Sequence, residues 1–132
     1  MTRLSKQDYM SLASFRKELR KFLRRSEEYA RNAGITPQQY LVLLAVKGQD
    51  GRDWASINEI GEILQLKHNA VVGLVDRCQA ANLVRREIHS GDRRVVMVTL
   101  TVDGDRTLEE IASQNLAEIQ TLGPLVAVLN TV

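Results

Sequence analysis

Residues 56–100 read SINEIGEILQLKHNAVVGLVDRCQAANLVRREIHSGDRRVVMVTL, and this stretch decides the fold. It opens with the spacing of a capping box, in which the side chains of Ser56 and Glu59 each bind the other's backbone amide at a helix start. Apolar residues then recur at helical spacing in two short runs, which are joined by the connector at residues 65–67. The apolar period falls to two on both sides of the Ser-Gly-Asp turn at residues 90–92, which predicts a β-hairpin. Two short helices followed by a hairpin predict a winged helix-turn-helix.

The sequence on either side of this motif predicts three more helices. The first, at about residues 5–33, carries an apolar stripe at steps of three and four residues. The second begins at another capping box, from Thr36 to Gln39, and is rich in apolar residues. The last begins near Thr101 and ends at the Gly-Pro pair at residues 123–124.

Together these elements predict a mainly α fold with a small β-hairpin wing. A chain of 132 residues suits a single domain, residues 1–132, with its winged helix-turn-helix core at about 36–100. The flanking helices would occupy about residues 5–33 and 102–132. The sequence has no apolar run that could span a bilayer, its N-terminus is charged throughout, and it has one cysteine, so we expect a cytoplasmic protein without membrane contact.

The net charge of +2 conceals a segregation of charge along the chain. Residues 1–35 carry nine basic and four acidic side chains, and residues 65–100 carry six basic and three acidic ones. Residues 36–64 and 101–132 are acidic, at −2 and −4. Basic surfaces attract phosphate through counterion release, although a charge of +3 over the motif also fits an ordinary solvated surface.

The second helix of the motif offers a polar, uncrowded face of the kind that enters a major groove. Asn69 could hydrogen-bond an adenine edge or a phosphate, and Val72 could contact a thymine methyl group. Gly73 weakens the helix by up to about 1 kcal/mol relative to Ala, which close approach of DNA would explain; close packing of another protein helix is the alternative. The face opposite the apolar residues presents His68, Asn69, Val72, Gly73, Asp76 and Arg77.

Basic side chains flank this face and occupy the tip of the hairpin. Lys67 and Arg77 are expected to contact phosphates, which fix the register of a protein on DNA without reading the sequence. Arg93 and Arg94 lie on a narrow projection that fits a minor groove, where negative potential favours arginine. Asp92 would repel phosphate, so we expect it to pair with one of these arginines and hold it in position; an ordinary exposed turn is the alternative.

Catalytic and metal-binding signals are missing from the sequence. It contains no Gly-rich phosphate loop, no carboxylate pair in a catalytic motif and no nucleophile motif, so we expect neither enzymatic activity nor a cofactor. His68, His89 and Cys78 match no zinc spacing, so we expect no metal site. Cys78 shares the apolar face of its helix and is interpreted as a small core residue, with a redox switch as the alternative.

Five short runs of the sequence form a set that can be compared with known protein families. They are INEIGEIL at 57–64, AVVGLVDR at 70–77, NLVRR at 82–86, DRR at 92–94, and LT followed by glycine at 100–104. This set resembles the MarR family of bacterial and archaeal transcriptional regulators, over about residues 36–108. The DRR wing followed closely by LT-x-x-G is its most specific part.

The resemblance implies a homodimer that is formed by the N- and C-terminal helices and binds a pseudo-palindromic operator in double-stranded DNA, usually as a repressor. On this chain the recognition helix would be residues 68–81, and Ser56 would cap the first helix of the motif near the phosphates. The implied DNA-binding set is Ser56, Lys67, His68, Asn69, Ala70, Val72, Gly73, Asp76, Arg77, Asp92, Arg93 and Arg94. The implied dimerisation set is Leu12, Phe15, Leu19, Leu116, Ile119 and Leu125.

The resemblance also implies release from DNA by a small aromatic or phenolic effector, bound between the dimer region and the DNA module. Phe22, Tyr40 and Trp54 lie near the pocket that this implies, although the default role of such residues is core packing. Two other functions stay open. One is a winged helix that binds protein instead of DNA, and the other is a ligand sensor whose output is not DNA release.

The sequence departs from the family pattern in three places. Residues 67–69 are Lys-His-Asn where the recognition helix often begins with Ser or Thr, and the first helix lacks the cysteine that peroxide-sensing members use. Only nine residues, Pro124 to Val132, follow the last break, so either the terminus is truncated or the first helix contributes more to dimerisation than usual. Its apolar stripe, Leu12, Phe15, Leu19 and Phe22, could also face the core of its own subunit.

Overall fold

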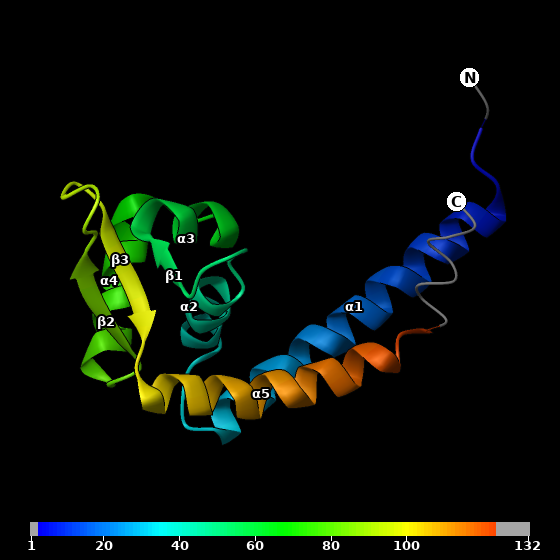
Figure 1. Cartoon of the computed structure of the whole chain (residues 1–132). Coiled ribbons are helices and arrows are strands. Elements are labelled where there is room, and N and C mark those ends of the chain that lie inside the picture. Colours follow the sequence, from blue (N-terminus) through cyan, green and yellow to red (C-terminus); the bar gives the residue numbers. More distant parts are fainter. Residues whose placement is uncertain (1–2, 124–132) are drawn as a thin grey trace.

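The computed structural model describes residues 3–123, which form five helices and three strands. Part of α1 and the C-terminal part of α5 lie side by side in an arm that projects from a body formed by the other elements (Figure 1). The predicted mainly α fold with a small wing is confirmed. In chain order the elements are α1 (Lys6–Asn32), α2 (Pro37–Lys47), β1 (Trp54–Ser56), α3 (Ile57–Leu64), α4 (His68–Ala80), β2 (Val84–Ile88), β3 (Val96–Leu100) and α5 (Val102–Gln120).

The predicted helix boundaries follow from local hydrogen bonds. At α2, Thr36 Oγ1 accepts from the amide of Gln39 at 3.1 Å, and Gln39 Oε1 accepts from the amide of Thr36 at 2.9 Å. Ser56 and Glu59 form the same reciprocal pair at α3, at 3.1 and 2.9 Å. Asn82, just beyond α4, adopts the left-handed conformation with φ of 59°, so the helix stop expected there is confirmed.

A third strand joins the hairpin of β2 and β3, and the sequence reading missed it. β1 pairs antiparallel with β3 on the side away from β2, with Ala55 opposite Val98. Because β1 has only 3 residues, it is too short for an alternating pattern to be detected. Ala55 and Val98 are both fully buried, so β1 closes the base of the wing over the core.

The start of α5 packs closely against the end of the helix-turn-helix, and a glycine makes this close packing possible. Thr101 Oγ1 donates to the carbonyl of Asn82 at 2.6 Å and accepts from the amide of Gly104 at 2.9 Å. A Cβ at Gly104 would lie 2.0 Å from the carbonyl oxygen of Leu83, which no side chain can tolerate. This contact explains why the Leu-Thr-x-x-Gly run needs its glycine.

The core lies in the body, and α1 contributes little to it. Of the residues of α1, all of which the structure describes, Ala30 alone is buried. The apolar stripe of α1 is divided: Leu12 is 58% exposed, whereas Phe15, Leu19 and Phe22 are half-buried. The largest fully buried side chains of the core are Val42, Leu43, Val46, Ile60, Val71, Leu74, Val75, Cys78, Val84, Val98 and Ile111.

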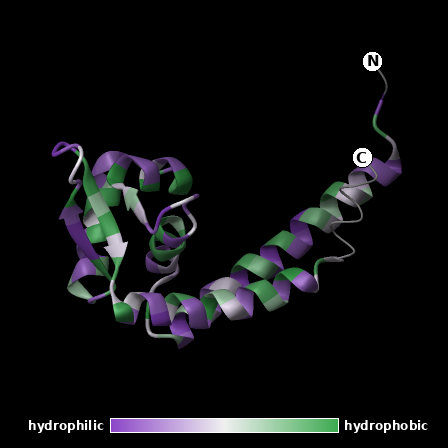
Figure 2. Ribbon diagram, in the orientation of Figure 1, coloured by the Kyte–Doolittle hydropathy of each residue, from purple (hydrophilic) through white to green (hydrophobic). Residues whose placement is uncertain are grey.

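Polar contacts tie the two helices of the arm together while apolar side chains stay exposed on it. Glu118 of α5 accepts hydrogen bonds from Tyr29 Oη at 2.7 Å and Arg25 Nη1 at 2.9 Å. These bonds, that of Tyr29 first, hold the pKa of the Glu118 carboxyl below its usual range. Leu116 and Ile119 nevertheless remain 61% and 48% exposed. Apolar residues lie along both helices of the arm (Figure 2). Across residues 3–123, none of the helices combines the length and the apolar character that a bilayer crossing needs.

Candidate nucleic-acid interface

α4 buries one face and exposes the other, as its period predicts. Val71, Leu74, Val75 and Cys78 are buried in the core. The opposite face combines exposed residues with two half-buried ones, so the predicted recognition residues share one open surface. The exposed residues are His68, Asn69, Ala70, Asp76 and Arg77, and the half-buried ones are Val72 and Gly73.

Gly73 borders open space on this surface. Apart from the two adjacent residues and the backbone of its own helix, the only atom of residues 3–123 within 4 Å of an added Cβ is Nη1 of Arg77, at 3.6 Å. No other element of the described chain packs against Gly73. The packing of this chain therefore does not explain why the helix has a glycine there.

Asp76 is bound by an arginine from the wing. Nη2 of Arg86 on β2 lies 2.6 Å from Asp76 Oδ1 and donates to the carbonyl of Val72 at 3.4 Å, while Nη1 donates to Gln79 Oε1. Arg86 thus connects β2 to three residues of α4 and offsets the negative charge on the recognition face. Sequence reasoning missed this residue, although the period of two puts Arg86 on the same side as the buried Val84, and a charge on that side needs a partner.

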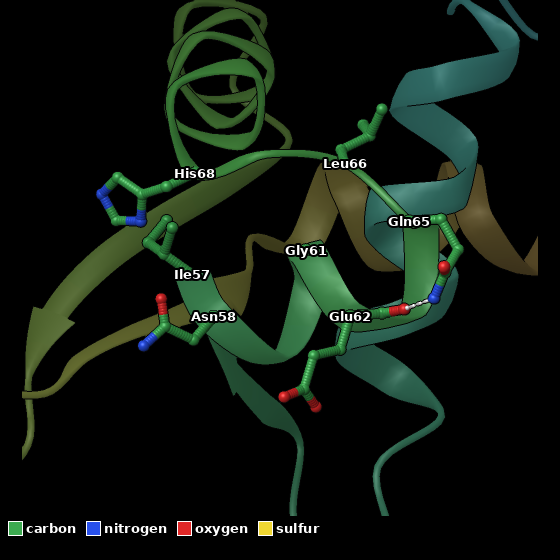
Figure 3. Close-up of a pocket in the computed structure, with 7 residues that line it drawn as sticks. All are labelled: Ile57, Asn58, Gly61, Glu62, Gln65, Leu66 and His68. Atoms are coloured by element: carbon green, nitrogen blue, oxygen red, sulfur yellow. Dashed lines mark hydrogen bonds between the residues drawn. The ribbon is translucent and has the colours of Figure 1, made fainter.

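A groove of about 450 Å³ separates α3 from the N-terminal end of α4 (Figure 3). His68, Ile57 and Asn58 lie toward one side of it, and Gln65 and Leu66 toward the other. Gln65 turns the connector in the left-handed conformation, with φ of 58°, and its Nε2 donates to a backbone carbonyl of α3 at 2.7 Å. Asn58 is exposed beside His68 and was not among the predicted site residues.

The start of α4 lacks the cap that Ser or Thr would provide. Lys67 is the N-cap residue, and it makes no side-chain cap hydrogen bond. Lys67 itself is exposed. Both features leave this helix end suited to an anionic group.

The wing tip pairs Asp92 with Arg94, as the sequence predicted for one of the two arginines. Asp92 Oδ1 accepts from Nε of Arg94 at 3.1 Å and from its amide at 3.0 Å, and Oδ2 accepts from Nη2 at 3.2 Å. These bonds hold the pKa of the Asp92 carboxyl below its usual range. The Arg94 side chain is still 91% exposed, and Arg93 is exposed beside it. Leu125, expected in the dimerisation set, lies outside the described residues.

The three aromatic residues expected near a ligand pocket lie in different places. Tyr40 is 5% exposed where α2 meets α5, and its hydroxyl accepts from Asn115 Nδ2 at 2.7 Å. Phe22 is half-buried on α1. Trp54 lines a groove of about 360 Å³ between the wing and α3, and neither Phe22 nor Tyr40 contributes to the lining of that groove.

Cys78 is fully buried, as its place on the apolar face predicts, and burial raises the pKa of its thiol to about 11. Within residues 3–123 there is no group of three or more His, Cys, Asp and Glu side chains that could hold a metal ion.

Comparison with known proteins identifies the winged motif. The family model described as the MarR family matches residues 33–95. The HTH-type transcriptional repressor MdtR of Bacillus subtilis is 36% identical over 78 residues, which are 59% of this chain and 48% of that protein. The chain thus spans about half the length of the curated relative that it matches.

Solved structures share the whole described architecture. AbsC, a MarR family transcriptional regulator from Streptomyces coelicolor, superposes with a TM-score of 0.72 at 19% identity, over 100% of both chains. A mutant of S. aureus MepR has a TM-score of 0.66 at 23% identity, over 90% of this chain and 83% of that one. Over residues 33–95 in sequence, and over the winged motif and the helical arm in fold, the chain is similar to members of the MarR family.

Proposed function

We propose that the protein is a sequence-specific regulator of transcription that binds double-stranded DNA, with α4 in the major groove and the wing in a flanking minor groove. The open face of α4 carries this proposal, because it is polar and its aspartate is neutralised by Arg86. Lys67, Arg77 and Arg94 surround that face with exposed positive charge. The related fold of S. aureus MepR, whose structure contains an oligodeoxyribonucleotide, supports this reading. We assign the chain no enzymatic activity.

The individual residues have distinct proposed roles at the DNA. Asn69 and Val72 read base edges, and Ser56, at the start of α3, lies near the phosphates. The remaining members of the predicted set contact phosphate, allow the backbone of α4 to come close or, as Asp76 and Asp92 do, bind an arginine side chain. These are Lys67, His68, Ala70, Gly73, Asp76, Arg77, Asp92, Arg93 and Arg94.

We infer a homodimer formed by the arm. Leu12 of α1 and Leu116 and Ile119 of α5 are about half exposed or more, and water contact with such large apolar side chains is unfavourable. Two copies of α4 would then enter successive major grooves, about 10 bp apart from centre to centre, which requires a pseudo-palindromic operator. Repression is the output that we propose, since the relative MdtR is described as a repressor.

A small aromatic or phenolic compound is the proposed effector. Its proposed site lies between the arm and the body, next to Tyr40; Phe22, on α1, has no shown contact with that site. Asn115 Oδ1 is buried there without a hydrogen-bond partner among the described residues and could accept a bond from a phenolic hydroxyl. Trp54 belongs to a different groove, so we leave it out of this site.

Selection from random-sequence duplexes tests the DNA proposal. Enrichment of a palindrome with half-sites about one helical turn apart, bound less tightly as salt rises, is the expected result. Weak binding with a steep salt dependence and no enrichment would leave only a basic surface. The protein-binding winged helix would then be the better interpretation.

A further inference from the structure

Three side chains at the wing form a stack that takes no part in the proposed DNA contacts. The guanidinium carbon of Arg52 lies 4.0 Å from the centre of the Trp54 ring. The rings of Trp54 and His89 are 5.3 Å apart, centre to centre, and tilted by 55°. Arg52 and Trp54 come from the segment before α3, whereas His89 directly follows β2, so the stack joins parts of the chain that are distant in sequence.

His89 also holds the backbone of the wing tip. Its Nδ1 accepts hydrogen bonds from the amides of Gly91, at 2.9 Å, and Asp92, at 3.0 Å. The backbone closes the same turn from the other side, because the amide of His89 donates to the carbonyl of Val95 at 2.9 Å. The turn that presents Arg93 and Arg94 is therefore built around one imidazole ring.

The ring and the turn are closely fitted. A Cβ at Gly91 would lie 3.0 Å from Cε1 and 3.3 Å from Nδ1 of His89, which is tighter than ordinary van der Waals contact. The glycine thus lets the backbone approach the ring closely enough for both amides to bond to Nδ1. A methyl group at this position would push the ring and the turn apart.

The other end of the stack is anchored to the helix-turn-helix. Arg52 forms an ion pair with Glu59, and Glu59 Oε1 accepts from the amide of Ser56 at the start of α3. Burial alone would raise the pKa of the Glu59 carboxyl, but the Ser56 amide and Arg52 outweigh it and hold that pKa below its usual range. A continuous set of contacts therefore leads from the wing tip through His89, Trp54 and Arg52 to α3.

We propose that His89, supported by Trp54, is a positioning residue for DNA binding: it fixes the turn that presents Arg93 and Arg94 to the minor groove. A turn that is already ordered loses less conformational freedom on binding than a flexible one. The imidazole combines an acceptor for two amides with an aromatic face for Trp54. This inference rests on the proposed DNA-binding function and adds a residue that does not itself touch DNA.

Two substitutions separate the acceptor from the ring. H89F keeps an aromatic ring against Trp54 but removes the acceptor. H89N removes the ring but restores an acceptor for the amide two residues on, as in an Asx turn. I88A is the matched control, because Ile88 is the exposed neighbour of His89 in the same hairpin, at 65% exposure.

Amide hydrogen exchange of Gly91 and Asp92 is measured in the full chain without DNA. We expect H89F to accelerate exchange at both amides about tenfold, the effect of losing one net hydrogen bond. At Gly91, H89N should stay within about threefold of the parent, and I88A should match the parent at both amides. Unchanged exchange in H89F, or exchange at Gly91 that is as fast in H89N as in H89F, overturns the role of the Nδ1 acceptor.

Affinity for the selected operator is then followed from low to high salt for the same variants. We expect H89F to bind about 3- to 10-fold more weakly and to lower the salt slope by about one unit, because one phosphate contact of the wing is lost. H89N should recover most of the lost affinity and most of the lost salt slope. Parent-like DNA binding by H89F, despite accelerated exchange, overturns the positioning role. A parent that selects no operator contradicts the proposed function instead, and the exchange data still decide whether His89 orders the turn.

Discussion

The substitution Gly73→Ala would place a methyl group 3.6 Å from the guanidinium of Arg77 and, the two adjacent residues apart, near no other described side chain. Alanine is the best helix former and glycine is among the worst, so the fold itself would favour the substitution. The glycine therefore lowers the stability of α4, and no packing contact compensates for this loss. The proposed close approach of DNA to this part of α4 would explain why the smaller residue stands there.

The variant G73A should raise the free energy of unfolding by about 0.5–1 kcal/mol, measured by urea denaturation. It should also weaken operator binding several-fold, because the added methyl group separates α4 from the groove. A variant that gains stability and binds the operator as the parent does would show that DNA does not come close to Gly73.

The thiol of Cys78 is protonated in the folded protein because burial raises its pKa from 9.0 to about 11. Above about pH 9 the unfolded chain releases this proton first, so stability that is fully present below pH 9 is lost as the pH rises through 11. Between these limits we expect the parent to lose up to about 3 kcal/mol more than C78A, from urea midpoints and slopes. Equal pH dependence of both proteins would contradict the burial, and rapid native alkylation of Cys78 near neutral pH would revive the redox alternative.

At the scale of elements, the wing and the recognition helix are connected by Arg86, which binds Asp76, Gln79 and the carbonyl of Val72. The Arg86 side chain is 27% exposed and that of Asp76 is 62% exposed, so the pair contributes to both stability and surface charge. Removing the arginine would leave an uncompensated negative charge on the proposed DNA-binding face.

The variant R86A should therefore lose about 1 kcal/mol of stability and about tenfold in operator affinity. Adding D76N to R86A should recover part of the operator affinity, because the neutral side chain no longer repels the DNA phosphates. It should recover little of the stability, because the contacts of Arg86 are still missing. Thermal denaturation and binding isotherms measure the two effects separately. If D76N restores nothing, the role of Arg86 is mechanical and unrelated to the charge of Asp76.

The wing and α4 should affect DNA binding in different ways. R94A is expected to weaken binding to all sequences and to reduce the salt slope by about one unit, as for the loss of one phosphate contact. N69A should instead relax discrimination at one base position, by about 1–3 kcal/mol if the contact is bidentate. R31A, which removes an exposed charge on α1, is the control for net charge. Parent-like binding by both R94A and N69A would mean that the DNA face is elsewhere.

For the whole molecule, the arm is the part whose surface is least consistent with a monomer. Its helices hold each other through Tyr29, Arg25 and Glu118, which leaves apolar side chains such as Leu12 and Leu116 exposed. In a dimer, binding by the second winged module becomes an intramolecular event with a high effective concentration.

The variant L116K should sediment as a folded monomer, because a lysine on a 61%-exposed site is tolerated in the subunit but not in an apolar interface. Operator affinity should fall at least tenfold, while binding to a single half-site stays unchanged. V102K, at a 76%-exposed apolar residue outside the arm contact, is the matched control. A dimeric L116K would place the subunit interface on another surface.

The sequence by itself determined the features that depend on neighbouring residues. The Ser56–Glu59 and Thr36–Gln39 boxes, the stop at Asn82 and the hairpin are local, since each needs only side chains within a few residues to satisfy backbone groups. The apolar period likewise predicted which face of α4 is exposed, and with it most of the candidate DNA surface. The Asp92–Arg94 pair belongs here too, because its partners are two residues apart.

Only the tertiary structure decided what depends on partners far apart in sequence. The pairing of β1 with β3, the contact of Arg86 with α4, and the stack that joins Trp54 to His89 involve residues that no local spacing relates. The same holds for the separation of Tyr40 from Trp54: Tyr40 contacts α5, whereas Trp54 lines the groove between the wing and α3, and no local spacing distinguishes the two. Spacing records which way a side chain points from its own helix or strand, whereas its partner is set by how those elements pack against one another.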